Sequence, residues 1–100
     1  MTEATTPFFS IGTVLSTPGA LEAFNRNGQS PLELLRRHVA KDWGDLSEED
    51  RQANEQSLVD GSRLLSAYKL KDGTKIWCIT EAVGENGHRE ATTFLLPSEY

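Results

Sequence analysis

The pattern of apolar residues changes from helical to strand-like at Ser62, and this change limits the fold more than any other feature. From there to the C-terminus, β-branched and apolar residues fall into three short runs separated by turn residues. The runs are Arg63–Leu70, Lys75–Val83 and Glu90–Leu96. Asp72-Gly73 and Asn86-Gly87 separate them, and such pairs are strong β-hairpin signals. We therefore predict a C-terminal three-stranded antiparallel meander.

The register of this meander follows if both turns are two-residue loops. Tyr68 then lies opposite Trp77, and Trp77 opposite Leu96, on a bulky face that we expect to pack on helices. That face carries Leu64, Ser66, Tyr68, Trp77, Ile79, Glu81, Thr92, Phe94 and Leu96. The second face carries Leu65, Ala67, Ile76, Cys78, Thr80, Ala91, Thr93 and Leu95. It is hardly polar, so it needs cover from the N-terminal segment or from a partner.

The N-terminal part of the chain contains an apolar segment followed by a helix signal. Phe8–Ser16 is short, apolar and partly β-branched, which favours an additional strand. Thr17-Pro18 supplies an N-cap with proline at the first helical position, and Gly28 is a suitable terminator. We expect this helix to turn Leu21 and Phe24 inward.

A second helix begins at Ser30-Pro31, where Ser30 and Glu33 predict a capping box. Its apolar stripe is Leu32, Leu35 and Val39, widened by Leu34. Basic residues fill its last turns, as the helix dipole favours, and Gly44 is the expected terminator.

A third, strongly polar helix is predicted from Ser47 to Gly61. Its first turn holds Glu48, Glu49 and Asp50, where the helix dipole favours acids. Its only apolar stripe is Ala53, Leu58 and Val59. The predicted fold class is therefore α+β: two to three N-terminal helices packed on the C-terminal meander, with Phe8–Ser16 as an extra N-terminal strand.

Size and composition exclude several classes of function. We expect residues 1–100 to form one domain, with residues 1–7 as a frayed lead-in. A net charge of −5 argues against phosphate-backbone binding, so no direct nucleic-acid binding is expected. No run approaches the ~20 apolar residues of a membrane span, and no secretion signal opens the chain. Cys78 is the only cysteine, so no internal disulfide forms, which suits the cytoplasm.

The residues that carry chemistry form no recognisable catalytic or metal motif. His38 has acids nearby, but their spacing matches no zinc or calcium site. We interpret His38 as a helix C-terminal histidine stabilised by the dipole and a neighbouring aspartate. Cys78 is predicted to be a buried mid-strand thiol, and no GxSxG elbow or Gly-rich phosphate loop occurs. Nothing in the sequence places a serine beside either histidine. From these missing motifs together, we expect no metal and no cofactor, and we lean against an enzyme.

Several stretches taken together resemble a family of small bacterial "plasmid-related" proteins encoded on plasmids and integrative elements. The stretches are Thr17–Leu21, His38 with Asp42-Trp43-Gly44, Leu64–Tyr68, Ile76–Glu81 and Leu95–Tyr100. The resemblance covers nearly the whole chain in order and spacing. It implies a cytoplasmic accessory protein of mobile DNA and carries over no functional residue.

The favoured function is a small, acidic, non-catalytic protein-binding module. In the setting of a mobile element it would modulate a host defence, in the manner of anti-restriction or anti-CRISPR proteins. The predicted partner-binding residues are Trp43, Asp45, Glu48, Glu49, Asp50 and Asn54. Trp43 has two interpretations, as an anchor of its loop in the core or as an exposed hot spot, and the core anchor is favoured.

Two alternatives belong to other classes. The first is a small nuclease-like toxin, in which His38, Arg63, Tyr68 and Thr80 would supply acid–base and phosphate-binding groups. The second is a structural subunit that forms a homodimer through the second sheet face.

Overall fold

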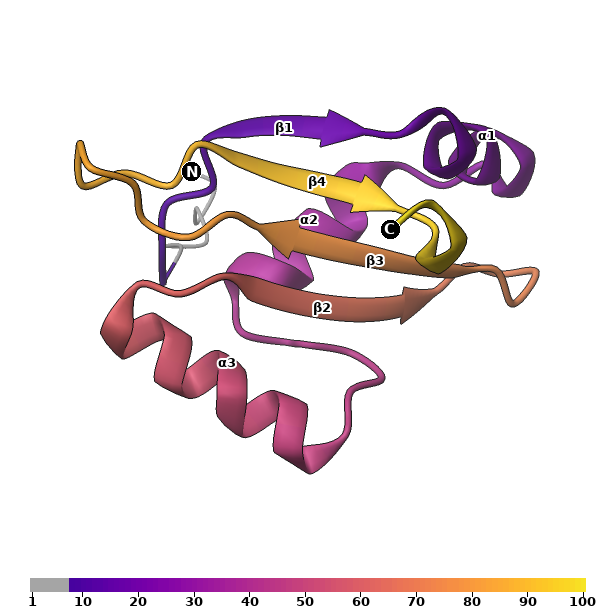
Figure 1. Ribbon diagram of the computed structural model, residues 1–100. Helices are drawn as coiled ribbons and strands as arrows, with labels where there is room; N and C mark the ends of the chain where they lie inside the picture. The colour runs from indigo at the N-terminus through magenta and orange to yellow at the C-terminus, as the bar shows by residue number, and fades with distance from the viewer. Residues whose placement is uncertain (1–7) are drawn as a thin grey trace, which may run out of the picture.

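The computed structural model describes residues 8–100, which form a four-stranded sheet with helices behind it and beside one edge (Figure 1). The elements are β1 (Thr13–Ser16), α1 (Pro18–Asn27), α2 (Pro31–Val39), α3 (Glu48–Asp60), β2 (Leu64–Lys69), β3 (Lys75–Thr80), β4 (Ala91–Leu95) and the short 3₁₀ helix η1 (Pro97–Glu99). The strand order is β1-β4-β3-β2. The α+β class is confirmed, but the sheet is not a three-stranded meander, because β1 joins β4 in parallel.

The predicted helix starts are confirmed by side-chain caps. Thr17 Oγ1 accepts from the Ala20 amide at 3.2 Å, and Ser47 Oγ accepts from the Asp50 amide at 3.1 Å. Ser30 caps α2 by accepting from the Leu32 amide. The predicted capping box with Glu33 is wrong, since that amide bonds the Ser30 carbonyl instead.

Helix α2 ends at Val39, earlier than the predicted terminator Gly44. Lys41 takes the left-handed conformation (φ 66°). The Asp42 amide donates to the Arg37 carbonyl at 2.8 Å, and the Lys41 amide donates to the His38 carbonyl. This is a Schellman motif, which satisfies the last helical carbonyls and turns the chain before any glycine is reached.

Both hairpins have three-residue loops, so the predicted register is wrong by one residue. The Leu70 amide bonds the Thr74 carbonyl and the Gly73 amide bonds the Leu70 carbonyl, and Gly84–His88 repeats this pattern. Gly73 and Gly87 are both left-handed, as a type I turn followed by a glycine bulge requires. A shift of one residue turns β3 over relative to its neighbours. The predicted pair of Tyr68 and Trp77 is therefore not formed.

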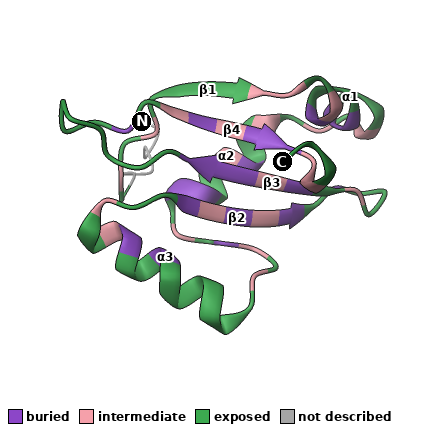
Figure 2. Ribbon diagram, in the orientation of Figure 1, coloured by how far each residue is buried: buried purple, intermediate pink, exposed green. Residues whose placement is uncertain are grey.

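The inner face of the sheet packs on α1 and α2, and its residues are buried (Figure 2). It carries Leu64, Ser66, Tyr68, Ile76, Cys78, Thr80, Thr92 and Phe94. Phe24 from α1 meets Phe94 edge-on at 5.5 Å between ring centroids. The helical stripes are confirmed in part: Phe24, Leu34 and Val39 are buried as predicted. Leu21 and Leu32 are exposed against prediction, and Ala20 and His38 are buried in addition.

Helix α3 docks beside β2 through polar groups, which overturns its predicted apolar stripe. Val59 is 81% exposed and Ala53 is exposed, whereas Asn54 and Ser57 are buried. The side-chain amide of Asn54 bonds both backbone groups of Leu65. Its Nδ2 donates to the Leu65 carbonyl at 2.6 Å, and its Oδ1 accepts from the Leu65 backbone amide at 3.0 Å. The backbone groups of Leu65 at this edge of β2 are thus paired by a side chain, while those of Ala67 are paired by the backbone of Trp43 and Asp45.

Among residues 8–100, no helix combines the length and the apolar character needed to cross a membrane.

Candidate functional site

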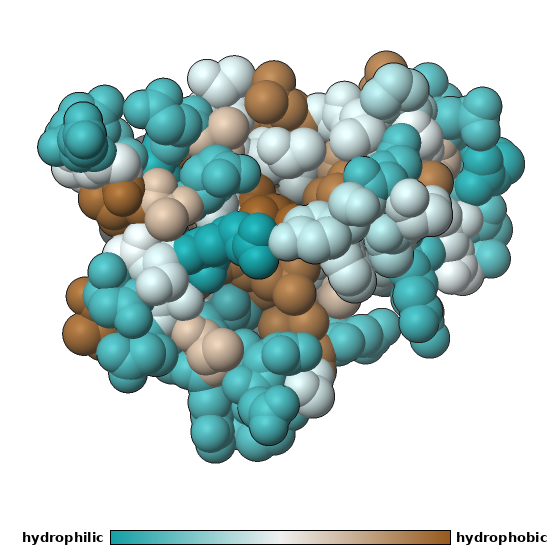
Figure 3. Space-filling view, viewed as in Figure 1, coloured by the Kyte–Doolittle hydropathy of each residue, from teal (hydrophilic) through white to brown (hydrophobic). Residues whose placement is uncertain are grey.

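The second face of the sheet, here called the outer face, is the candidate site. It consists of Leu65, Ala67, Trp77, Ile79, Thr93 and Leu95, which are cross-strand neighbours in the observed register. Helices α1 and α2 lie on the opposite side of the sheet, while η1 and the C-terminal residue reach one end of this face (Figure 1). Figure 3 views the molecule from the outer face, and hydrophobic side chains gather at its centre.

Trp77 lies at the centre of the outer face and separates two hollows. It is partly exposed, and it pairs with Ala67 on one side and Leu95 on the other. Its ring meets the Tyr100 ring edge-on at 5.7 Å between centroids. An indole held in this way offers a large rigid surface with little side-chain entropy left to lose on binding.

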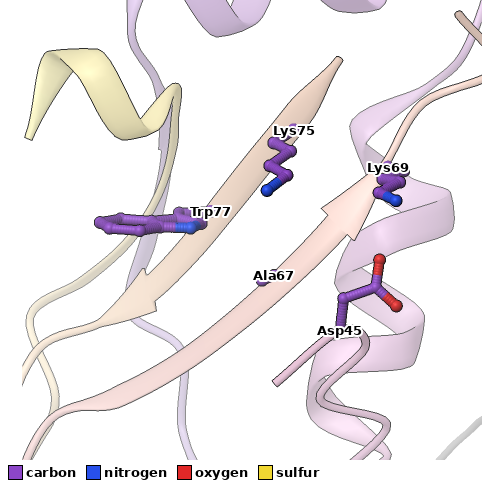
Figure 4. Close-up of a pocket in the computed structure, with 5 residues that line it drawn as sticks. All are labelled: Asp45, Ala67, Lys69, Lys75 and Trp77. Atoms are coloured by element: carbon purple, nitrogen blue, oxygen red, sulfur yellow. The ribbon is translucent and has the colours of Figure 1, made fainter. Parts of the chain in front are cut away.

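The first hollow has a volume of about 240 Å³ and is lined by charged residues around Trp77 (Figure 4). Lys69 and Lys75 project from β2 and β3, and Asp45 enters from the loop before α3. Figure 4 shows the Asp45 carboxylate directed toward Lys69, while the Trp77 ring extends toward the opposite side of the hollow.

The second hollow is more apolar and lies on the other side of Trp77. Its volume is about 210 Å³, and its lining is Arg63, Leu65, Trp77, Ile79 and Tyr100. The Arg63 guanidinium lies 5.6 Å from the centroid of the Tyr100 ring, a cation–π contact that stabilises both side chains.

The two hollows are lined by three cations, Lys69, Lys75 and Arg63, and by one carboxylate, Asp45, in a chain whose net charge is −5. Lys69 and Lys75 are direct cross-strand partners, and like charges in this position repel each other. In residues 8–100, the ion pairs within 4.0 Å involve Arg26, Arg37 and Lys41. Neither lysine nor Arg63 has a carboxylate at that distance within the described chain.

A second polar group, in the interior, is a hydrogen-bonded chain centred on His38. Its Nδ1 lies 2.5 Å from Ser66 Oγ and its Nε2 lies 2.8 Å from Thr80 Oγ1. Thr80 Oγ1 continues to Thr92 Oγ1 at 2.7 Å, and the Thr92 hydroxyl donates to the Ile11 carbonyl. This order of donors assigns the proton of a neutral imidazole to Nε2.

Burial, and secondarily the charge of Arg89, lowers the pKa of His38 to about 4. The predicted interaction of His38 with a neighbouring aspartate is wrong, because its hydrogen-bond partners are hydroxyl groups. The expectation that no serine lies beside a histidine is also wrong, since Ser66 bonds His38. The pair is nevertheless no active site, since His38 and Ser66 are both 0% exposed and a nucleophile needs access to its substrate.

The residues named for a nuclease do not form one accessible group, although His38 and Thr80 are hydrogen-bonded to each other. His38, Tyr68 and Thr80 are buried on the inner face, whereas Arg63 is exposed and borders the second hollow. Cys78 is buried as predicted, and burial raises the pKa of its thiol. In the part of the chain that the structure describes, no three His, Cys, Asp or Glu side chains gather to hold a metal ion.

The predicted partner-binding residues are divided between the interior and the surface. Trp43 is 3% exposed, which confirms the core-anchor interpretation; its indole N–H donates to Glu55 Oε2 at 3.3 Å. Asn54 is buried against β2. Asp45 borders the first hollow. The exposed acids Glu48, Glu49 and Asp50 lie together on the first turn of α3.

Sequence reasoning missed Trp77, Tyr100, Lys69 and Lys75 as candidates. The signal was present in the hairpin, because a three-residue loop at Asp72-Gly73 pairs the two lysines and turns Trp77 away from the helices. No protein-family model, curated protein or solved structure matches the chain. The candidate site therefore rests on geometry and charge alone.

Proposed function

We propose that the protein is a non-catalytic binding module that engages another protein through the outer face of its sheet. The observation that supports this most strongly is Trp77, a partly exposed indole between two hollows on the sheet face opposite α1 and α2. Tryptophan, tyrosine and arginine dominate the binding energy of protein interfaces, and Trp77, Tyr100 and Arg63 adjoin one another here.

The distribution of reactive groups also favours binding over catalysis. The polar chain around His38 is inaccessible, and the Cys78 thiol is buried within the sheet. The accessible groups at the two hollows are lysines, an arginine, an aspartate and aromatic rings, which suit recognition of a ligand that is both charged and apolar. In the mobile-element setting that the resemblance implies, the partner would be a protein of the host defence.

The first experiment compares partner capture by three forms of the tagged chain in a bacterial host. We expect Trp77→Ala to lose a stoichiometric protein partner that the unchanged chain retains, because truncation removes the central contact surface. Val59→Ser is the control, since Val59 is 81% exposed on α3, away from the outer face. Thermal unfolding checks that each variant is folded.

A fourth form, with Glu48, Glu49 and Asp50 changed to Lys, tests the acidic turn of α3 as the competing surface. Loss of the partner in that form but not in Trp77→Ala would move the site to α3. If both variants still capture the partner, neither the outer face nor the acidic turn of α3 is its binding site. A purified chain whose native mass is that of a dimer, and which becomes monomeric in Trp77→Ala, would instead assign the outer face to self-association.

A further inference from the structure

We propose that the outer face selects an acidic peptide segment: its carboxylates lie against Lys69, Lys75 and Arg63, and an apolar side chain enters the second hollow, which Trp77 and Tyr100 line together with Leu65 and Ile79. This inference rests on the proposed function and adds the chemistry of the partner. It is carried by the two hollows and by the position of the unpaired cations around them.

The first argument is the cross-strand pair of Lys69 and Lys75. Two ammonium groups on directly opposed residues repel each other, and in the described chain neither has a carboxylate within 4.0 Å. Asp45 borders the same hollow but does not pair with them. A carboxylate from outside that enters the hollow meets two cations at once and removes the repulsion between them.

The second argument is the composition of the neighbouring hollow. Leu65 and Ile79 form its aliphatic floor, and Trp77 and Tyr100 form aromatic walls. A leucine-sized or phenylalanine-sized side chain matches such a lining. Because Trp77 borders both hollows, an anchor in one lies next to a carboxylate in the other, and a short extended peptide carries both groups.

A single-stranded nucleic acid fits the same surface less well. A nucleic-acid strand is bound along a groove whose cations follow its phosphate backbone, whereas three cations line the two hollows: Lys69, Lys75 and Arg63. A peptide places its few carboxylates where the cations lie and needs no continuous basic track.

The test selects random peptides displayed on phage against the full chain and against Lys69→Glu/Lys75→Glu. Both lysines are exposed, so their reversal leaves the fold intact, which thermal unfolding verifies. The matched control is Arg36→Glu/Lys71→Glu, which makes the same change in net charge at exposed positions outside both hollows. The best selected peptide is then synthesised with its acids intact, and with each acid changed to Lys.

We expect selected peptides to combine Glu or Asp with one large apolar residue and to bind more weakly as salt rises. Affinity should fall roughly tenfold or more in Lys69→Glu/Lys75→Glu and stay unchanged in the control. The peptide with Lys in place of its acids should bind the reversed variant instead. Basic or neutral selected peptides, equal binding to both variants, preferential binding of oligothymidylate, or no enrichment at all would each overturn the proposal.

Failure here is distinguishable from failure of the proposed function. A captured protein partner that is lost in Trp77→Ala but retained in Lys69→Glu/Lys75→Glu leaves the binding module intact and removes only the preference for an acidic segment.

Discussion

His38 is fully buried in a chain of hydroxyl groups, and its protonation predicts how stability varies with pH. Its pKa is about 4 in the folded protein against 6.5 for an ordinary histidine, so the unfolded chain takes up the proton first. The contribution of the neutral imidazole is therefore complete above pH 6.5. It falls by about 3 kcal/mol as the pH drops from 6.5 to 4, and it changes no further below that.

Urea unfolding across this pH range measures the effect. In His38→Gln, whose amide still bonds the neighbouring hydroxyls, we expect the free energy of unfolding to lose most of its slope between pH 6.5 and 4. His88→Gln is the control, because it makes the same substitution at the other histidine, which is exposed in a turn. An NMR titration that gives His38 an ordinary pKa near 6.5 would contradict the account even if the variant does not fold.

At the scale of elements, the Asn54 side chain makes two hydrogen bonds that join α3 to the edge of β2. Asn54→Ala leaves the amide and carbonyl of Leu65 without partners at a protected edge. We expect it to lower the free energy of unfolding by about 2–3 kcal/mol. Chemical denaturation measures this. Gln52→Ala, on an exposed position of the same helix, should change it by less than about 0.5 kcal/mol. Equal effects of the two substitutions would mean that α3 is held by other contacts.

At the same scale, the sequence predicts where the helices begin but not the strand register or the buried side of α3. Caps at Thr17, Ser30 and Ser47 locate the helix starts, because a hydroxyl beside the first turn is a local signal. Register is not local in this sense: a Gly after Asp or Asn satisfies either a two-residue loop or a three-residue loop. The buried side of α3 was missed because Asn54 packs by hydrogen bonds, which hydrophobic periodicity does not detect.

At the scale of the whole molecule, helices α1 and α2 cover one face of the sheet, and the other face is covered only at one end, by η1 and the C-terminal residue (Figure 1). The sequence predicts that the second sheet face needs cover from the N-terminal segment or a partner, but not that Trp77 lies on it, because the shift of one residue in β3 exchanges Trp77 for Cys78 between the faces. Once the register is known, the aromatic centre, the opposed lysines and the two hollows follow together. The acidic turn of α3, predicted as the partner surface, stays a prediction and is the main competitor.

The most direct measurement of the central claim is an NMR map of the chain with its captured protein partner. The account predicts that backbone and indole signals change on the outer face, at Trp77, Lys69, Lys75 and Ile79, while Glu48, Glu49 and Asp50 keep their free positions. Changes confined to the first turn of α3, with the Trp77 indole unaffected, would contradict it and place the interface on the acidic helix.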